Sequence, residues 1–242
     1  DREGEAQPVR VATATKADVP QYLQGLGTVT PANTVLVRSR VDGELVSLNF
    51  VEGQKVNEGD LLARVDTRPY EVQLAQAEGA LARDEALLKN ARQDLERFRK
   101  LNKEGSVSLQ QLQNQESLAA QYEGAVRVDM AGIADAKLQL TYCRITAPVS
   151  GRIGIKRVDL GNMIRASDTS GIAVITQVQP IYVVFTLVEK QIPNVRKAMR
   201  AHSENLAVEA WDQEGKNILA TGTLLTLDNQ IDTSTGTVKA KA

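Results

Sequence analysis

Two segments of the chain, 108 residues apart, repeat the same pattern of apolar residues and glycines. Residues 41–56, VDGELVSLNFVEGQKV, align without a gap to residues 149–164, VSGRIGIKRVDLGNMI. The alignment places apolar residue on apolar residue and glycine on glycine: Val41 on Val149, Gly43 on Gly151, Leu45 on Ile153, Gly53 on Gly161, and Val56 on Ile164. Two Val- and Gly-rich segments can resemble each other by chance, but ungapped agreement at both glycines favours a true internal repeat.

Each copy of the repeat predicts three short strands joined by tight turns. Apolar residues alternate with polar ones, as in strands with one buried face. We interpret Gly43, Gly53, Gly151 and Gly161 as structural turn glycines. One copy alone is too small to bury its apolar face. We therefore expect the two copies to be the halves of one small β-sandwich that is split in the sequence.

The segment between the two halves has a helical pattern. Residues 70–140 contain no proline, and apolar residues recur every seven positions, as in the a/d seam of a coiled coil. The first arm carries Leu74, Leu81, Leu88 and Leu95, with a second row at Ala77, Ala91 and Phe98 that Asp84 interrupts. The second arm carries Leu112, Ala119, Val126, Ile133 and Leu140, with a more mixed row at Gln115, Tyr122, Asp129 and Ala136. We expect two long helices packed along one seam, with charged outer faces.

A chain reversal is predicted between the two arms, at residues 102–108. Gly105 can adopt the left-handed conformation that ends a helix, and Ser108 with Gln111 forms the capping-box pattern that begins one. The two helices are therefore expected to be antiparallel. The first arm, from Tyr70 to Lys103, would extend about 50 Å.

Composition argues against several classes of function. A formal net charge of −1 offers no basic surface for nucleic acid. Cys143 and His202 are the only residues of their types, too few for a structural zinc site, and His202 has no Gly-x-Ser-x-Gly motif that would indicate a hydrolase. No segment reaches the roughly 18 to 20 consecutive apolar residues that span a bilayer. We expect a protein that is not an enzyme and that uses no metal and no cofactor.

The predicted fold class is α+β, elongated and modular, with an antiparallel coiled-coil hairpin inserted in a split lipoyl-like or biotinyl-like β-sandwich, plus a β-barrel-like module. Strands are also expected from the alternation at Val9, Val11 and Thr13, and a short helix at residues 192–201. The predicted domains are residues 1–33 (strands joining the β-barrel or membrane-proximal region), 34–68 (first half of the lipoyl-like domain), 69–141 (helical hairpin), 142–178 (second half) and 179–242 (β-barrel-like domain). A membrane-proximal domain is expected to follow.

The assembled pattern resembles the periplasmic adaptor subunits of resistance-nodulation-division efflux pumps, which are also called membrane fusion proteins. The resemblance lies in residues 41–66 before the heptads and residues 144–164 after them, and it extends over nearly the whole chain. Residues 25–29, GLGTV, and 227–237, LDNQIDTSTGT, look most like the multidrug adaptors of the Mdt type, which work with a pair of different permease subunits.

The resemblance implies a non-enzymatic adaptor that links a proton-driven drug permease of the inner membrane to an outer-membrane channel for multidrug export. It also implies a location in the periplasm, with an inner-membrane anchor at an N-terminus that is not present in this chain. Self-association into a ring, a trimer or a hexamer, is expected as well.

At the hairpin tip, members of this family carry an Arg, a Leu four residues on and a Ser seven residues further, through which they engage the channel. Arg97, Leu101 and Ser108 match that spacing. Each residue also has a purely structural interpretation: Arg97 as a solvated charge, Leu101 as the last residue of the seam, and Ser108 as the helix N-cap.

Other functions are compatible with parts of the pattern. An adaptor of a type I secretion system or an ATP-driven exporter shares the same plan. A biotin or lipoyl carrier has a similar split β-domain, but it presents its acceptor lysine on a tight turn where this chain has the heptads; Lys156 is expected within a strand. A heavy-metal adaptor is disfavoured because Met130, Met163 and Met199 lie far apart in the sequence.

Overall fold

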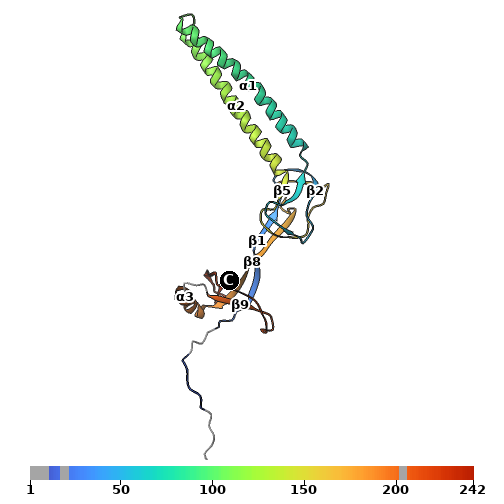
Figure 1. The fold of residues 1–242 in the computed structure, drawn as a ribbon, viewed down its shortest axis with the longest axis vertical. Coiled ribbons are helices and arrows are strands. Elements are labelled where there is room, and N and C mark those ends of the chain that lie inside the picture. Colours follow the sequence, from blue (N-terminus) through green and yellow to red (C-terminus); the bar gives the residue numbers. More distant parts are fainter. Residues whose placement is uncertain (1–10, 17–21, 202–205) are drawn as a thin grey trace, which may run out of the picture. The chain divides into compact units, whose positions relative to one another are not determined.

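The structure, a computed structural model, describes residues 11–16, 22–201 and 206–242. It divides into two compact units. One comprises residues 31–181, and the other comprises residues 182–242 with residues of the first thirty. Two strands, β1 (Gly27–Val37) and β8 (Ala173–Val188), have residues in both units and pair with each other. The first unit contains the long helical hairpin and the β-domain at its base (Figure 1).

Strands from the two repeat copies pair with each other in the β-domain. The first copy and its continuation form β2 (Gly43–Leu48), β3 (Lys55–Val56) and β4 (Leu61–Val65). The second copy forms β6 (Gly151–Ile153) and β7 (Met163–Ile164), and β5 (Arg144–Thr146) directly precedes it. One sheet has the order β5-β4-β2-β7, and β3 pairs with β6, which pairs with β8. All of these pairs are antiparallel. Each half therefore completes the sheets of the other, as the repeat predicts.

The core of the β-domain contains the apolar positions that the repeat aligned. Leu45 and its counterpart Ile153 are fully buried, as are Leu62, Ile172 and Ile175. These side chains belong to one continuous hydrophobic cluster. Because both halves contribute to this cluster, neither could exclude water from its apolar face alone.

The four repeat glycines do not all serve the same purpose. Gly43, Gly53 and Gly161 have φ values of 151°, 79° and 82°. Gly151 is the first residue of β6, as Gly43 is of β2, but its φ is not positive. A Cβ atom there would lie 2.6 Å from the backbone oxygen of Thr176 in β8, and glycine is required because the two strands approach so closely.

The hairpin consists of α1 (Arg68–Lys103) and α2 (Leu109–Tyr142). Every apolar seam residue predicted from the heptads is buried or half-buried. Leu88, Ala91 and Leu95 of α1 and Ala119 and Val126 of α2 are buried between the helices. Since an isolated helix gains little stability in water, packing along this seam stabilises both helices.

The second unit is a smaller β-rich module with one helix. It contains β9 (Ala207–Trp211), β10 (Ile218–Thr223), β11 (Thr226–Asp232), β12 (Thr237–Lys241), the short 3₁₀ helix η1 (Glu189–Gln191) and α3 (Ile192–Ala201). β9 pairs with β10, and β12 lies between β11 and the C-terminal half of β8. Leu187, Val195, Leu224 and Val238 form its core. The helix predicted at residues 192–201 is confirmed.

One N-terminal expectation was wrong. Residues 11–16 have no regular secondary structure and are all exposed, so the alternation at Val11 and Thr13 has no buried face there. Val9 lies outside the described residues.

The close approach at Gly151 can be tested against a neighbouring glycine. Gly151→Ala should lower the thermal unfolding midpoint by about 2–4 °C or more, the shift that about 1 kcal/mol gives in a chain of this size. Gly154→Ala is the matched control, because the nearest atom to a Cβ at Gly154 is 3.4 Å away. Equal midpoints for the two variants, measured by differential scanning calorimetry, would contradict the close-approach explanation.

Candidate functional site: the tip of the helical hairpin

A backbone motif at the tip terminates α1. Gly105 has φ 71°, a left-handed conformation that costs glycine little. The backbone N–H of Ser106 donates to the carbonyl of Leu101 at 2.9 Å, and that of Gly105 donates to the carbonyl of Asn102 at 3.0 Å. This pair of bonds is the Schellman motif of helix C-termini. The Asn102 side chain also donates to the carbonyl of Val107 at 3.2 Å, which ties the turn to the end of the helix.

The second helix begins with the capping box that the sequence predicts. The Ser108 hydroxyl accepts a hydrogen bond from the backbone N–H of Gln111 at 3.3 Å. In return, the Gln111 side chain accepts one from the backbone N–H of Ser108 at 2.9 Å. Two N–H groups at the helix start are satisfied in this way, so the reversal is closed by local contacts on both sides.

Two of the three predicted tip residues share one stretch of α1, and the third begins α2. Arg97 and Leu101 lie one turn apart on the same face of the helix. The Arg97 guanidinium is exposed and makes an ion pair with Asp94 at 3.2 Å, whereas Leu101 is half-buried. Ser108 is exposed and lies across the reversal. The arrangement presents a cation, an apolar side chain and a hydroxyl at one end of a rigid hairpin.

The structure adds contacts near the tip that sequence reasoning missed. Arg99 of α1 makes an ion pair with Glu116 of α2 at 3.1 Å, and Arg92 lies 3.7 Å from Glu123 farther from the tip. Such exposed pairs each contribute less than about 1 kcal/mol, and both connect α1 to α2. Leu109 is 62% exposed at the first position of α2. An apolar residue directly after the predicted N-cap was the sequence signal that could have identified Leu109 as a tip residue.

The middle of the seam contains two carboxylates. Asp84 is buried, and Asp129 of α2 faces it across the seam. A hydrogen bond from the Arg83 guanidinium to Asp84, 2.6 Å long, holds the pKa of Asp84 below its ordinary value. One carboxylate oxygen of Asp129 is buried and has no hydrogen-bond partner among the described residues. The seam is therefore less stable here than an apolar pair would make it.

Of the residues considered for other chemistry, those that the structure describes belong to different segments of the chain. Lys156 is in the loop after β6, where strand pairing ends at Ile153, so its expected place within a strand was wrong. Its ammonium group pairs with Asp159 at 2.6 Å, which raises the pKa of Lys156. Cys143 is fully buried, and burial raises the pKa of its thiol. His202 lies outside the described residues. Met130, Met163 and Met199 belong to three different elements, α2, β7 and α3.

Two further findings concern the described part of the chain as a whole. Its residues contain no group of three or more His, Cys, Asp or Glu side chains placed to hold a metal ion. None of its helices combines the length and the apolar character needed to cross a membrane.

A helical hairpin inserted between the halves of a barrel-sandwich β-domain is the arrangement of membrane fusion proteins, and comparison with known families agrees. The sequence model of the RND membrane fusion protein barrel-sandwich hybrid domain matches residues 33–176. The model of the RND membrane fusion protein beta-barrel domain matches residues 180–242. The chain belongs to the family of RND (resistance-nodulation-division) membrane fusion proteins.

A curated relative is similar along nearly the whole chain. "Multidrug resistance protein MdtA" of Yersinia pseudotuberculosis serotype O:3 (strain YPIII) is 58% identical over 238 residues, which are 97% of this chain and 54% of the relative. The resemblance to adaptors of the Mdt type is thereby confirmed. The chain spans about half the length of the curated relatives it matches.

Solved structures share the fold at low sequence identity. The membrane fusion protein Spr0693 from Streptococcus pneumoniae R6 has a TM-score of 0.66 and 18% identity, over 90% of this chain and 91% of that one. A MacA-MexA chimeric protein with the Pseudomonas aeruginosa MexA α-hairpin domain has a TM-score of 0.59 and 22% identity, over 89% and 71% of the two chains. At these identities the comparison supports the fold alone.

The cap at Ser108 can be separated from any role of Ser108 in binding. Ser108→Ala removes the acceptor for the Gln111 N–H and should destabilise the hairpin by about 1 kcal/mol. Ser108→Asp keeps an acceptor at the N-cap and should stay close to the parent protein. Urea unfolding followed by far-UV circular dichroism measures both. Equal losses in the two variants would show that the cap observed here does not stabilise α2.

Proposed function

We propose that this chain is part of a periplasmic adaptor that links a proton-driven drug permease of the inner membrane to an outer-membrane channel. In this role the adaptor exports several classes of drug and catalyses no reaction. The 58% identity to a protein named for multidrug resistance supports the proposal. An anchor to the inner membrane, and a permease made of two different subunits, belong to the same proposal.

The observation that carries the proposal is the position of the hairpin in the β-domain. A biotin or lipoyl carrier uses the turn between its two half-domains to display a lysine. Here that position holds two helices, of 36 and 34 residues, closed at the far end by a Schellman motif and a capping box. Such a hairpin is suited to reach a distant partner rather than to carry a prosthetic group. Lys156 supports this view, since its side chain is already paired with Asp159.

The proposed docking end is the group Arg97, Leu101 and Ser108. The guanidinium of Arg97 is exposed and can donate directional hydrogen bonds to carbonyls or carboxylates of a channel. The side chain of its partner Asp94 is 46% exposed, so exchanging it for a channel carboxylate costs little. A tip of this size offers a small interface, and we propose that several adaptors in a ring, a trimer or a hexamer, bind together and gain strength by multivalency.

Each segment of the chain has its own proposed role. Residues 69–141 dock on the channel, and residues 34–68 with residues 142–178 form the ring. Residues 179–242, with strands from residues 1–33, face the permease together with a membrane-proximal domain. The observed helices begin at Arg68 and end at Tyr142, within one residue of the proposed hairpin bounds.

The docking end is tested by changing the tip of the full-length protein in cells that lack their own adaptor. Leu101→Asp and Ser108→Arg should each reduce drug resistance to the level of cells without adaptor, because charge or bulk prevents docking. The purified variants should retain the far-UV circular dichroism of the parent.

Matched controls are available on α2, about two and a half turns or more beyond Ser108. Val128→Asp and Ser117→Arg make the same chemical changes at exposed positions and should preserve resistance. Full resistance in both tip variants, or equal loss in the controls, would refute the assignment of the docking end.

A further inference from the structure

The hairpin joins the β-domain through very short connections. β4 ends at Val65 and α1 begins at Arg68, while α2 ends at Tyr142 and β5 begins at Arg144. Val65 donates a backbone hydrogen bond to the carbonyl of Cys143 at 2.9 Å, so the two connections are held together. Short connections limit how far the hairpin can move, but two backbone links alone do not fix the direction of a long rod.

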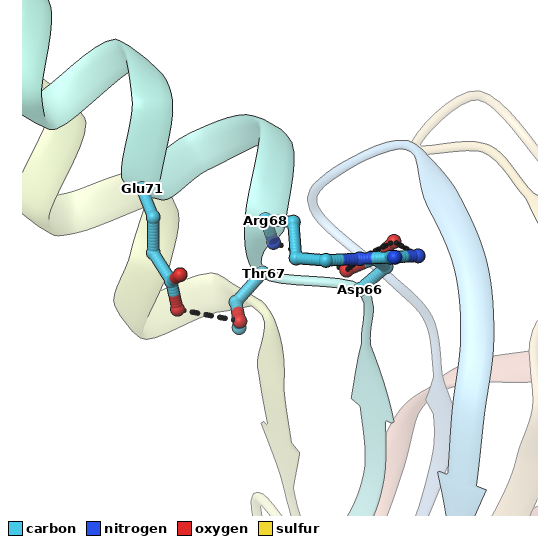
Figure 2. Close-up of polar contacts among 4 residues, drawn as sticks. All are labelled: Asp66, Thr67, Arg68 and Glu71. Carbon is cyan, nitrogen blue, oxygen red and sulfur yellow. Dashed lines mark hydrogen bonds and ion pairs between the residues drawn. The ribbon is translucent and has the colours of Figure 1, made fainter.

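The start of α1 is held by side chains in an unusual way (Figure 2). The N-cap residue Thr67 makes no side-chain capping bond; its hydroxyl instead donates to Glu71 at 2.8 Å. The Asp66 carboxylate accepts the backbone N–H of Arg68 at 3.0 Å and the Arg68 guanidinium at 2.7 Å. These bonds hold the pKa of Asp66 below its ordinary value, so the carboxylate stays ionised at neutral pH. The first turn is thus tied to the end of β4.

A single loop of the β-domain contacts the bases of both helices. We name residues 38–44, the loop between β1 and β2 together with the first two residues of β2, the base loop. The Tyr70 hydroxyl of α1 donates to the backbone carbonyl of Asp42 at 2.7 Å. The guanidinium of Arg40 lies over the ring of Tyr142 of α2, 5.0 Å from its centroid. In addition, the backbone N–H of Asp66 donates to the carbonyl of Glu44 at 2.9 Å. The base loop therefore contacts the outgoing helix, the returning helix and the connection between β4 and α1.

The base loop is itself firmly seated. Val41 is buried in the core of the β-domain, and the hydroxyl of the buried Ser39 is hydrogen-bonded to the backbone of Val41. The Asp42 side chain accepts the backbone N–H of Ala166 at 2.7 Å. The base loop is held by the core of the β-domain, and its partners belong to the helices or to the connection before α1. The contacts between them can therefore resist bending of the hairpin relative to the β-domain.

The two tyrosines suit this task. Both rings pack against the core of the β-domain, and both stand within a turn or so of a helix end. Burial raises the pKa of Tyr70, so its phenol remains protonated and able to donate throughout the neutral range. The cation–π contact between Arg40 and Tyr142 does not depend on pH near neutrality, because arginine stays charged.

We propose that Tyr70 and Arg40 are positioning residues that lock the direction of the hairpin relative to the β-domain. The lock matters because the hairpin is a long lever. A helix of 36 residues is about 54 Å long, so a tilt of about 10° at its base displaces the tip by about 9 Å. Such a displacement exceeds the reach of a hydrogen bond, and the tip would miss its partner. This consequence for docking rests on the proposed function, whereas the lock itself does not.

The lock is tested by a distance measurement in the full-length protein. Spin labels are attached at Asn49→Cys in the β-domain and at Lys89→Cys on α1, both exposed positions, and the distance distribution is measured by double electron–electron resonance. The double variant Tyr70→Phe with Arg40→Gln removes one hydroxyl and one charged guanidinium group. We expect its distribution to widen by on the order of 5 Å, since the label at residue 89 is about 30 Å along the lever.

The matched control is Tyr122→Phe with Arg38→Gln. These residues lie in the hairpin seam and on the base loop, and neither side chain makes a hydrogen bond, ion pair or ring contact with the described residues. The control should keep the parent distribution. A distribution in the test variant that matches the control would overturn the proposal. So would equal widening in both variants.

Folding and function are read separately. If the double variant unfolds, the single variant Tyr70→Phe, which removes only one oxygen atom, takes its place with the same expected widening. In cells, the double variant should lower drug resistance although Arg97, Leu101 and Ser108 at the tip are all intact. Failure of the proposed function would instead show as full resistance in Leu101→Asp, an outcome that leaves the distance measurement interpretable. A widened distribution with unchanged resistance would overturn the claim that the lock aims the tip.

Discussion

Pairing of β4 with β5 is the contact on which the rest of this unit depends. The two strands belong to the two halves of the β-domain, on either side of the hairpin in the sequence, and Leu61 pairs with Thr146 and Arg64 with Arg144. The entropic cost of closing so long an insertion is reduced because the insertion is itself a closed structure, a hairpin whose two ends already lie together. The seam and the split sheet therefore stabilise each other. Loss of the seam would leave β4 and β5 at the ends of a long flexible loop.

This mutual dependence explains why stabilising contacts concentrate at the two ends of the hairpin. At the tip, the Schellman motif at Gly105 and the capping box at Ser108 satisfy backbone groups that would otherwise be exposed at the helix ends. At the base, contacts of Asp42 and Arg40 with the helix ends oppose tilting. The middle is less well packed, since carboxylates interrupt the seam there. A rod built in this way keeps its ends defined, as a docking element requires.

Features encoded locally could be predicted from the sequence, whereas features that depend on distant partners could not. The seven-residue period predicted the seam, and the pair Ser108 and Gln111 predicted the cap, because both patterns act within a few helical turns. The strand position of Gly151 depends on how close β8 comes, and nothing near Gly151 reveals it. The same holds for Arg40, whose partner Tyr142 lies far along the chain. Arg97 and Leu101 were selected by family resemblance, and their role stays a prediction.

Site-specific photo-crosslinking in living cells tests the central claim, that the hairpin tip is the end that docks on a channel. A photoreactive phenylalanine analogue replaces Leu109, an exposed apolar residue at the tip, or Val128, an exposed apolar residue on α2. The account predicts that the probe at Leu109 crosslinks to an outer-membrane channel protein identified by mass spectrometry, and that the probe at Val128 does not. Crosslinks to that channel from Val128 but not from Leu109, or from neither position in cells that show full resistance, would contradict it.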